Sequence, residues 1–115
     1  MLSGHLIKNI NFAQVIEMET LVEYQEGRVV SRTLAQGKPL SVTLFAFDKE
    51  EEISSHSASG DALVYLLDGQ AEITIGEEKF TVNKGETIVM PAHVPHALLA
   101  KEKFKMLLIV VFSLS

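Results

Sequence analysis

Two histidines, His56 and His96, are the residues of this chain best suited to chemistry. They stand forty residues apart, in strand-like segments with glycine or proline turns nearby. A neutral imidazole binds borderline transition metals and can accept or deliver a proton near neutral pH. The chain has no cysteine, so thiolate metal sites, redox motifs and disulfides are excluded. Candidate chemistry therefore centres on the two imidazoles.

Composition limits the classes of partner. The 115 residues suit one domain, and 10 basic against 15 acidic residues give a net charge of −5. The basic residues are scattered, so we expect no nucleic-acid partner. The longest strongly apolar run, Met106 to Phe112, is far shorter than the about 20 residues of a membrane span. The N-terminus lacks the apolar region of a secretory signal. We expect a cytoplasmic protein with no membrane partner.

Alternation of apolar and polar residues predicts strands. Ala71 to Ile75 alternates, residues 76–78 turn the chain, and Phe80 to Val82 resumes the alternation, which predicts a hairpin. A turn is also predicted at Asp68-Gly69. About eight short strands in one domain predict an all-β jelly roll or small barrel. The other predicted strands are Val29–Gln36, Leu40–Phe47, Ala62–Leu67, Glu86–Met90, His96–Ala100 and Phe104–Ser113.

The N-terminal part of the sequence follows neither the period of two of a strand nor the period of 3.6 residues of a helix. Residues 1–28 are predicted as an irregular segment, with a short helical turn between Phe12 and Tyr24, and residues 29–113 as the barrel of the same domain.

Two predicted strands are apolar on both faces, at residues 62–67 and 106–112. A half-buried strand has one polar face, so something must cover the outer face of this sheet. The N-terminal segment is one candidate cover, and a second copy of the chain across a twofold axis is the other. We expect a homodimer.

From about Ser41 to Phe112 the chain resembles a small single-domain cupin, a jelly-roll barrel. The second motif of that family, G(x)5PxG(x)2H(x)3N, is matched by Gly85, Pro91 and His96. His93 stands in place of its second glycine, and Ala100 in place of its asparagine.

The first motif, G(x)5HxH(x)3,4E(x)6G, is retained less completely. Its first histidine is His56 and its last glycine is Gly69. Ala58 stands at the second histidine, Ala62 at the glutamate, and Glu50 at the opening glycine. The resemblance therefore implies the fold more strongly than the chemistry.

Metal-binding cupins hold an ion with three histidines and a glutamate, so the resemblance implies a reduced metal site here. Methyl groups at Ala58 and Ala62 donate no electrons, which predicts no strong four-ligand site. A divalent ion (Zn, Ni, Mn or Fe) would be held weakly by His56 and His96, with His93 as a tentative third ligand. Asp61 is another possible substitute. His93 and Asp61 lie at odd offsets from the motif positions and would need an irregular backbone to face inward.

The resemblance also predicts a small, mainly apolar pocket in the barrel, in which the two alanines leave room for an organic ligand. An imidazole pair could bind an anionic or carbonyl-bearing molecule, or act as base and acid. The simpler alternatives are that His96 is a barrel-lining residue bonded to water or backbone, and that His93 is a rim or turn residue. The predicted lining is His56, Ala58, Ala62, Val64, Leu66, His96 and Leu98.

Three functions remain open on the sequence. The first is a small-molecule-binding barrel, with or without a weakly held divalent metal. The second is a metal-dependent cupin enzyme such as an isomerase, lyase or dioxygenase. The third is a structural or sensory dimer whose barrel is only a core. The fold does not decide among them.

Overall fold

The computed structural model describes residues 5–113, and its regular structure is almost entirely β-strand. The predicted helical turn in the N-terminal segment is confirmed as a short 3-10 helix, η1 (Met18–Leu21). No helix in the described part of the chain is long and apolar enough to cross a membrane. The strands are β1 (Val29–Gln36), β2 (Leu40–Phe47), β3 (Glu52–His56), β4 (Asp61–Ile75), β5 (Glu78–Asn83), β6 (Thr87–Met90), β7 (His96–Leu99) and β8 (Phe104–Val111).

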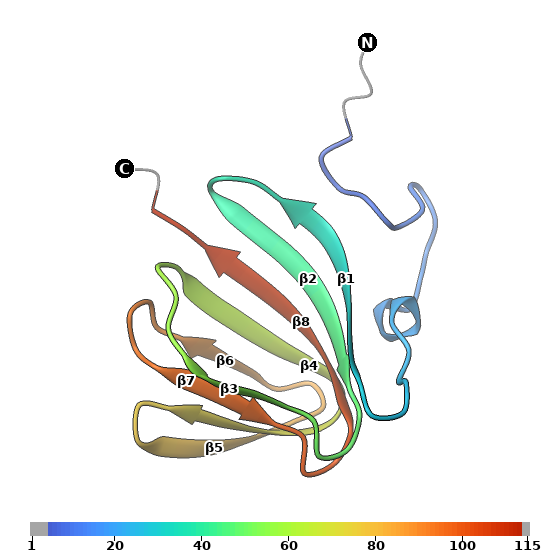
Figure 1. Ribbon diagram of the computed structural model, residues 1–115. Helices are drawn as coiled ribbons and strands as arrows, with labels where there is room; N and C mark the ends of the chain where they lie inside the picture. The colour runs from blue at the N-terminus through green and yellow to red at the C-terminus, as the bar shows by residue number, and fades with distance from the viewer. Residues whose placement is uncertain (1–4, 114–115) are drawn as a thin grey trace.

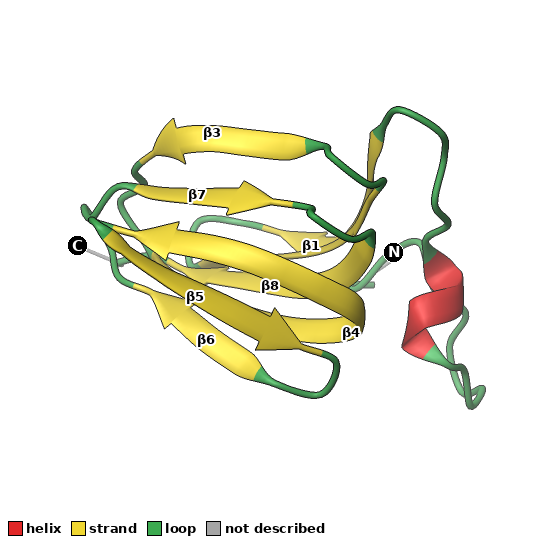
Figure 2. Ribbon diagram, turned by 90° about the horizontal axis from the view of Figure 1, so that it is seen from below, coloured by secondary structure: helices red, strands yellow, loops and turns green. Residues whose placement is uncertain are grey.

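The long strand β4 belongs to two sheets that curl toward each other (Figure 1). Its first half pairs with β8 on one side and β6 on the other, and β2 and β1 extend this first sheet beyond β8. Its second half pairs with β7 and β5, and β3 extends the second sheet beyond β7. Figure 2 shows η1 outside the strands, at one end of the molecule. The predicted all-β jelly roll is confirmed.

The predicted turn at Asp68-Gly69 is wrong, because β4 continues through both residues. The pairing of β4 with β8 shifts its register between Leu66 and Asp68, which is a β-bulge at the point where β4 leaves one sheet for the other. Gly69 has a positive φ of 76° and lies against the backbone of Lys103. Glycine here therefore marks a bulge and a close backbone approach rather than a turn.

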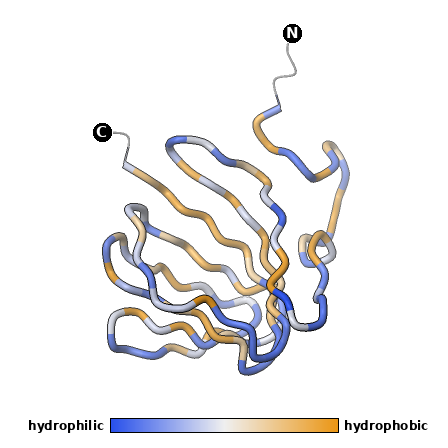
Figure 3. The backbone as a smooth tube through the Cα atoms, in the orientation of Figure 1, coloured by the Kyte–Doolittle hydropathy of each residue, from blue (hydrophilic) through white to orange (hydrophobic). Residues whose placement is uncertain are grey.

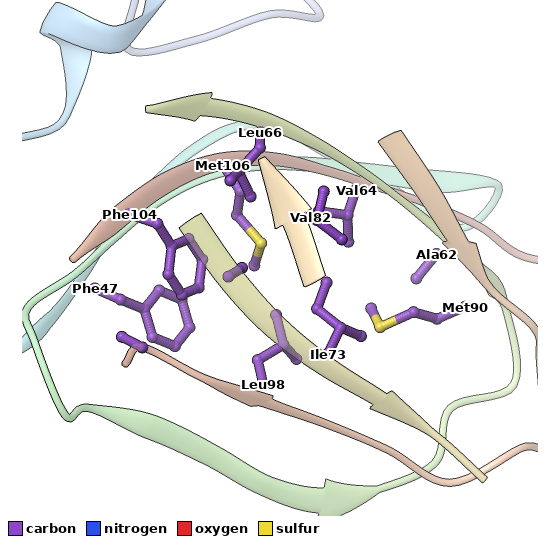
Figure 4. Close-up of a cluster of buried hydrophobic side chains, with 12 residues drawn as sticks. Phe47, Ala62, Val64, Leu66, Ile73, Val82, Met90, Leu98, Phe104 and Met106 are labelled. Atoms are coloured by element: carbon purple, nitrogen blue, oxygen red, sulfur yellow. The ribbon is translucent and has the colours of Figure 1, made fainter. Parts of the chain in front are cut away.

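The main core lies between the inner faces of the two sheets (Figure 4). Phe47 of β2 and Phe104 of β8 are fully buried, and their rings stack with centroids 4.4 Å apart. Alternate residues of β4 point inward, and Ala62, Val64 and Leu66 are all buried. The alternation that predicted the strands also shows which residues of each strand point inward, because alternate side chains lie on opposite faces of a sheet.

A second, smaller core lies on the outer face of the first sheet, beneath the N-terminal segment. Val22 packs there with buried residues of β1 and β2, among them Leu34 and Leu44. The hydroxyl of Tyr24 donates a hydrogen bond of 2.6 Å to Asp68. The N-terminal segment therefore covers part of this apolar face.

Candidate functional site

The structure places His56 and His96 directly opposite each other on the antiparallel strands β3 and β7. Directly opposed residues point to the same face of a sheet. Their ring centroids are 4.4 Å apart and the rings are nearly perpendicular, at 70°. His96 is buried, with 4% of its surface exposed, whereas His56 is exposed. The pair therefore extends from the interior of the barrel, at His96, to its surface, at His56.

A bulge in β3 brings a further residue to the same face. Ile53 pairs with Leu98 and His56 with His96, and the register shifts between the two pairs. Ile53 and His56 are three residues apart and would face opposite sides in a regular strand. The irregular backbone lets both line one cavity.

Hydrogen bonds to the backbone fix the tautomer of both rings. Nδ1 of His56 lies 3.0 Å from the carbonyl oxygen of Ser54, and Nδ1 of His96 lies 3.2 Å from that of Val94. A carbonyl oxygen only accepts, so each Nδ1 carries the hydrogen and donates it. In the neutral rings, Nε2 therefore has a free lone pair. The site offers two hydrogen-bond acceptors or two metal-ligating nitrogens.

The two imidazoles line a cavity of about 90 Å³ between the sheets. Ala58, Ala62 and Leu98 line it too, so five of the seven residues predicted for the pocket come together there. Val64 and Leu66 do not line it, because both are fully buried further along β4 in the closed core. The remaining lining residues are Phe45, Ile53, Met90, Met106, Leu108 and Val110.

Five of these six additional residues were missed for identifiable reasons. Strand β8 is apolar on both faces, so its sequence does not show whether Met106, Leu108 and Val110 or the alternate set points inward. Ile53 reaches the cavity only through the bulge in β3. An alternation reading of β2 from its buried end would have found Phe45, which lies two residues before the buried Phe47.

His93 and Asp61 take part in hydrogen bonds that hold the backbone beside the cavity. His93 is exposed in the turn before β7, with a positive φ of 66°, and its backbone N–H donates to the carbonyl oxygen of Ala58. The Asp61 carboxylate accepts a 2.7 Å hydrogen bond from the backbone N–H of Ala92. Neither residue lines the cavity. Together they join the turn of residues 91–95 to the loop that follows His56.

The side chains present do not fit the four-ligand metal site of metal-binding cupins. Within residues 5–113, no three His, Cys, Asp or Glu side chains gather closely enough to hold a metal ion. The two alanines occupy cavity positions where the motif has a histidine and a glutamate. His93, the tentative third ligand, does not join the imidazole pair in such a group.

Three larger hollows lie away from the histidines, and two of them contain charged residues. One of about 440 Å³ is lined by residues 80–82 and 86–88, and one of about 310 Å³ lies over β3, β7 and the second half of β4. The first contains Glu86 and the second contains Glu52 and Glu72, all outside the barrel. The second hollow also contains Ser54, Thr74 and Lys79, but within residues 5–113 no side chains in either hollow form a metal-ligand set. The cavity that holds the imidazole pair therefore remains the candidate site.

Burial of the His96 ring lowers its pKa, and the nearby His56 lowers it further. The hydrogen bond to Val94 acts in the opposite direction. In the unfolded chain, His96 regains its ordinary pKa of about 6.5. Below that pH the unfolded state therefore takes up a proton that the folded state resists, so the stability of the fold decreases as pH falls.

We expect the free energy of unfolding to decrease more between pH 7.5 and pH 5.5 in the natural chain than in His96→Gln. Glutamine removes the titrating group but keeps a polar side chain. Urea titrations at the two pH values measure the difference. His93→Gln is the matched control, because His93 is exposed, and it should retain the full pH dependence. Equal pH dependence in all three proteins would contradict the prediction.

The fold and this cavity define a small β-barrel with an imidazole pair that has His96 in the interior and His56 at the surface. The chain belongs to the cupin domain family, whose pattern matches residues 43–112. The resemblance read from residues 41–112 is thereby confirmed.

Two solved structures share the whole architecture. The chain is 46% identical to a conserved protein of unknown function from Streptococcus pyogenes, over 99% of this chain and 100% of that one, with a TM-score of 0.96. It is 33% identical to a cupin superfamily protein from Desulfitobacterium hafniense, over 93% of this chain and 98% of that one, with a TM-score of 0.89. A shorter match, 38% identity over 40 residues, covers 35% of this chain and 32% of an uncharacterised protein of Methanocaldococcus jannaschii.

Proposed function

We propose that the barrel binds a small molecule whose hydrogen-bond donor is received by Nε2 of His96 and His56. The observation that carries the proposal is the pair of Nδ1 contacts with backbone carbonyls, which leaves Nε2 as the acceptor atom on two imidazoles that line an otherwise apolar cavity. Clefts that bind small molecules have this composition, with a few placed polar groups in an apolar lining.

The tautomers narrow the class of ligand. A carboxylate or a carbonyl oxygen needs a donor, and a neutral imidazole whose Nδ1–H is already bonded has none left. The lowered pKa of His96 keeps its ring neutral at physiological pH. The pocket therefore favours an uncharged molecule with an O–H or N–H group over an anion.

The volume of the cavity narrows the class of ligand further. The cavity of about 90 Å³ is smaller than an engineered apolar cavity of about 150 Å³ that admits benzene. Because His56 is exposed, a ligand can enter beside it and extend out of the barrel. A compact molecule with its donor directed inward fits both facts.

A weakly held divalent metal is the second candidate, favoured by the same contacts. Metal-ligating histidines usually donate their other ring N–H to a backbone carbonyl, a carboxylate or water, as both rings here do. Catalytic zinc normally has three protein ligands, so water or an organic ligand would complete the coordination of Zn, Ni, Mn or Fe. Neither candidate requires catalysis.

Phenol is a suitable probe because it is neutral and carries one O–H, and its ring can extend out of the barrel beside the exposed His56. We expect phenol to shift the NMR signals of the His96 ring and to bind about tenfold more tightly than anisole, which lacks the donor. Benzoate should bind less well than phenol at pH 7.5. Binding should be lost in His56→Ala with His96→Ala and kept in the control His93→Ala. Equal binding of phenol and anisole, or binding retained in the double variant, would refute the proposal.

Elemental mass spectrometry of the tag-free protein tests the metal candidate on the same variants. Metal near one ion per chain that disappears in the double variant would establish an ion on the two histidines. Metal content well below one ion per chain, unchanged by the substitutions, would leave the metal-free pocket as the function of the barrel.

A further inference from the structure

Two methionines line the cavity together with the imidazole pair. Met90 comes from the end of β6 and Met106 from β8, and both side chains are buried. Figure 4 shows their sulfur atoms, in yellow, among the side chains between the two sheets. Strand β8 is hydrophobic along most of its length (Figure 3), so Met106 brings a sulfur atom into otherwise hydrocarbon surroundings. A thioether sulfur is a weak hydrogen-bond acceptor but a good ligand for soft metal ions.

The donor atoms of this cavity are nitrogen and sulfur alone. Eleven residues line it, and all of them lie in the described part of the chain. Within that lining, only the two histidines and the two methionines have a side-chain atom other than carbon. The lining therefore offers two imidazole nitrogens and two thioether sulfurs, and it has no carboxylate.

Met90 lies beside the motif position from which the glutamate is missing. It pairs directly with Ala62 of β4, the residue at that position. Directly paired side chains are neighbours on one face of a sheet. Alanine is short, and a methionine side chain adapts its shape through three rotatable bonds. The space that a glutamate at position 62 would use is therefore open to the thioether of Met90.

We propose that the cavity is a binding site for monovalent copper, Cu(I), held by the two ring Nε2 atoms and the two thioether sulfurs. Thioethers are soft ligands that select Cu(I), and imidazole also binds copper. The inference rests on the same Nε2 atoms as the proposed function. It goes beyond that function because it adds Met90 and Met106 as ligands and names an ion of different charge and softness.

The charge of the lining favours a monovalent ion. All four ligand groups are neutral, so no group in the lining offsets the charge of an ion. The Born cost of moving an ion from water into an apolar medium rises with the square of its charge. Zinc in proteins is bound by thiolates, imidazoles and carboxylates, and Cu(II) prefers nitrogen and oxygen ligands. The donor set therefore favours Cu(I) over both divalent ions.

The cavity also gives an ion space and access. Methionine commonly fills irregular gaps in a core, yet about 90 Å³ remains open beside these two side chains. His56 is exposed, which provides an entry path. The Nδ1–H of each ring is bonded to a backbone carbonyl, which fixes the orientation of the ring. An ion can therefore enter beside His56 and meet nitrogen ligands that are already oriented.

Methyl NMR of the natural chain tests the inference without any substitution. Isotope labelling of the methionine methyl groups gives a signal for each of the four methionines. One equivalent of Cu(I), added in the absence of oxygen, should shift the signals of Met90 and Met106. The signal of Met18 should stay unchanged, because Met18 packs in the second core and does not line the cavity. Unchanged signals of Met90 and Met106 would overturn the inference.

Competition against a Cu(I) chelator measures the affinity. Met90→Leu with Met106→Leu should weaken Cu(I) binding by more than about tenfold and change Zn²⁺ binding much less. Leucine and methionine have similar volumes, so the core accepts the exchange, and circular dichroism melting curves verify that the variant is folded. Met18→Leu is the matched control and should retain the full Cu(I) affinity. Cu(I) affinity that withstands the double substitution would overturn the inference.

Phenol binding separates this inference from the proposed function. A natural chain that binds phenol but not Cu(I) overturns the copper site and leaves the small-molecule pocket intact. A natural chain that binds Cu(I) but not phenol supports the copper site and removes the proposed pocket. In either case His56→Ala with His96→Ala should lose the ligand that the natural chain binds, and Cu(I) retained in that variant would place the ion elsewhere and overturn the inference.

Discussion

Replacing Gly69 by alanine is expected to destabilise the fold by more than about 3 kcal/mol, a large share of the 5–15 kcal/mol typical of a domain. A Cβ at this position would overlap the carbonyl oxygen of Lys103 and would lie 2.9 Å from the Cα of Phe104. Both contacts are with backbone, so relief requires β4 to move away from the start of β8. Urea unfolding of the natural and variant chains measures the loss.

Gly85→Ala separates the clash from the backbone conformation. Gly85 has a positive φ of 85°, but a Cβ there would meet nothing within 4 Å. The free energy of unfolding of this control should decrease by only about 1–2 kcal/mol, which is the cost of placing alanine in a left-handed conformation. A Gly69→Ala protein as stable as the Gly85→Ala protein would show that the close approach to Lys103 is not important.

The second large effect is expected from restoring the two missing motif ligands. Ala58→His with Ala62→Glu should raise the affinity for zinc more than about 100-fold, since loss of even an outer-sphere partner costs about 10–100-fold. Both alanines line the cavity with His56 and His96, so the four side chains would converge there. Isothermal titration with Zn²⁺ alone measures the change.

Thermal stability gives a second measure of this variant. A glutamate at the buried position of Ala62 would lack a partner without an ion, so the metal-free variant should melt below the natural chain and zinc should raise its melting temperature strongly. The same double substitution in a His96→Ala background is the control and should lose most of the gain. Zinc affinity equal to that of the natural chain would show that the four positions do not converge.

The Gly69 variant tests a motif residue that the fold requires, and the Ala58 and Ala62 variant tests motif positions that face the cavity. Gly69 has a backbone role, where β4 passes between the sheets, and the fold requires it whatever the barrel binds. Positions 58 and 62 face the cavity, where the fold tolerates alanine and the chemistry changes. A cupin can therefore keep its barrel and lose its metal-ligand set independently.

The imidazole pair retains an orientation suited to binding. Both Nδ1 atoms donate to carbonyls two residues earlier in the chain, so local backbone alone orients each ring. Orientation of this kind does not depend on a metal being present. The two histidines are thereby oriented in a cavity whose other two motif positions hold alanine.

The sequence by itself determined most of the strands, because a period of two is a local property of neighbouring residues. Strands β1 and β2 have the predicted bounds, and the hairpin of β4 and β5 lies where alternation placed it. The spacing of Gly85, Pro91 and His96 identified the family, which the cupin domain match to residues 43–112 confirms. Spacing within one strand likewise placed His96 and Leu98 on the same face.

Only the tertiary structure decided which distant side chains share the cavity. Two bulges, in β3 and in β4, change which face a residue meets, and alternation cannot show where a regular strand breaks. Strand β8 is apolar on both sides, so its inner face became known only from its pairing with β2 and β4. The tautomers of His56 and His96 depend on the local backbone conformation at Ser54, in the bulge of β3, and at Val94, in the turn before β7, and neither irregularity can be read from alternation.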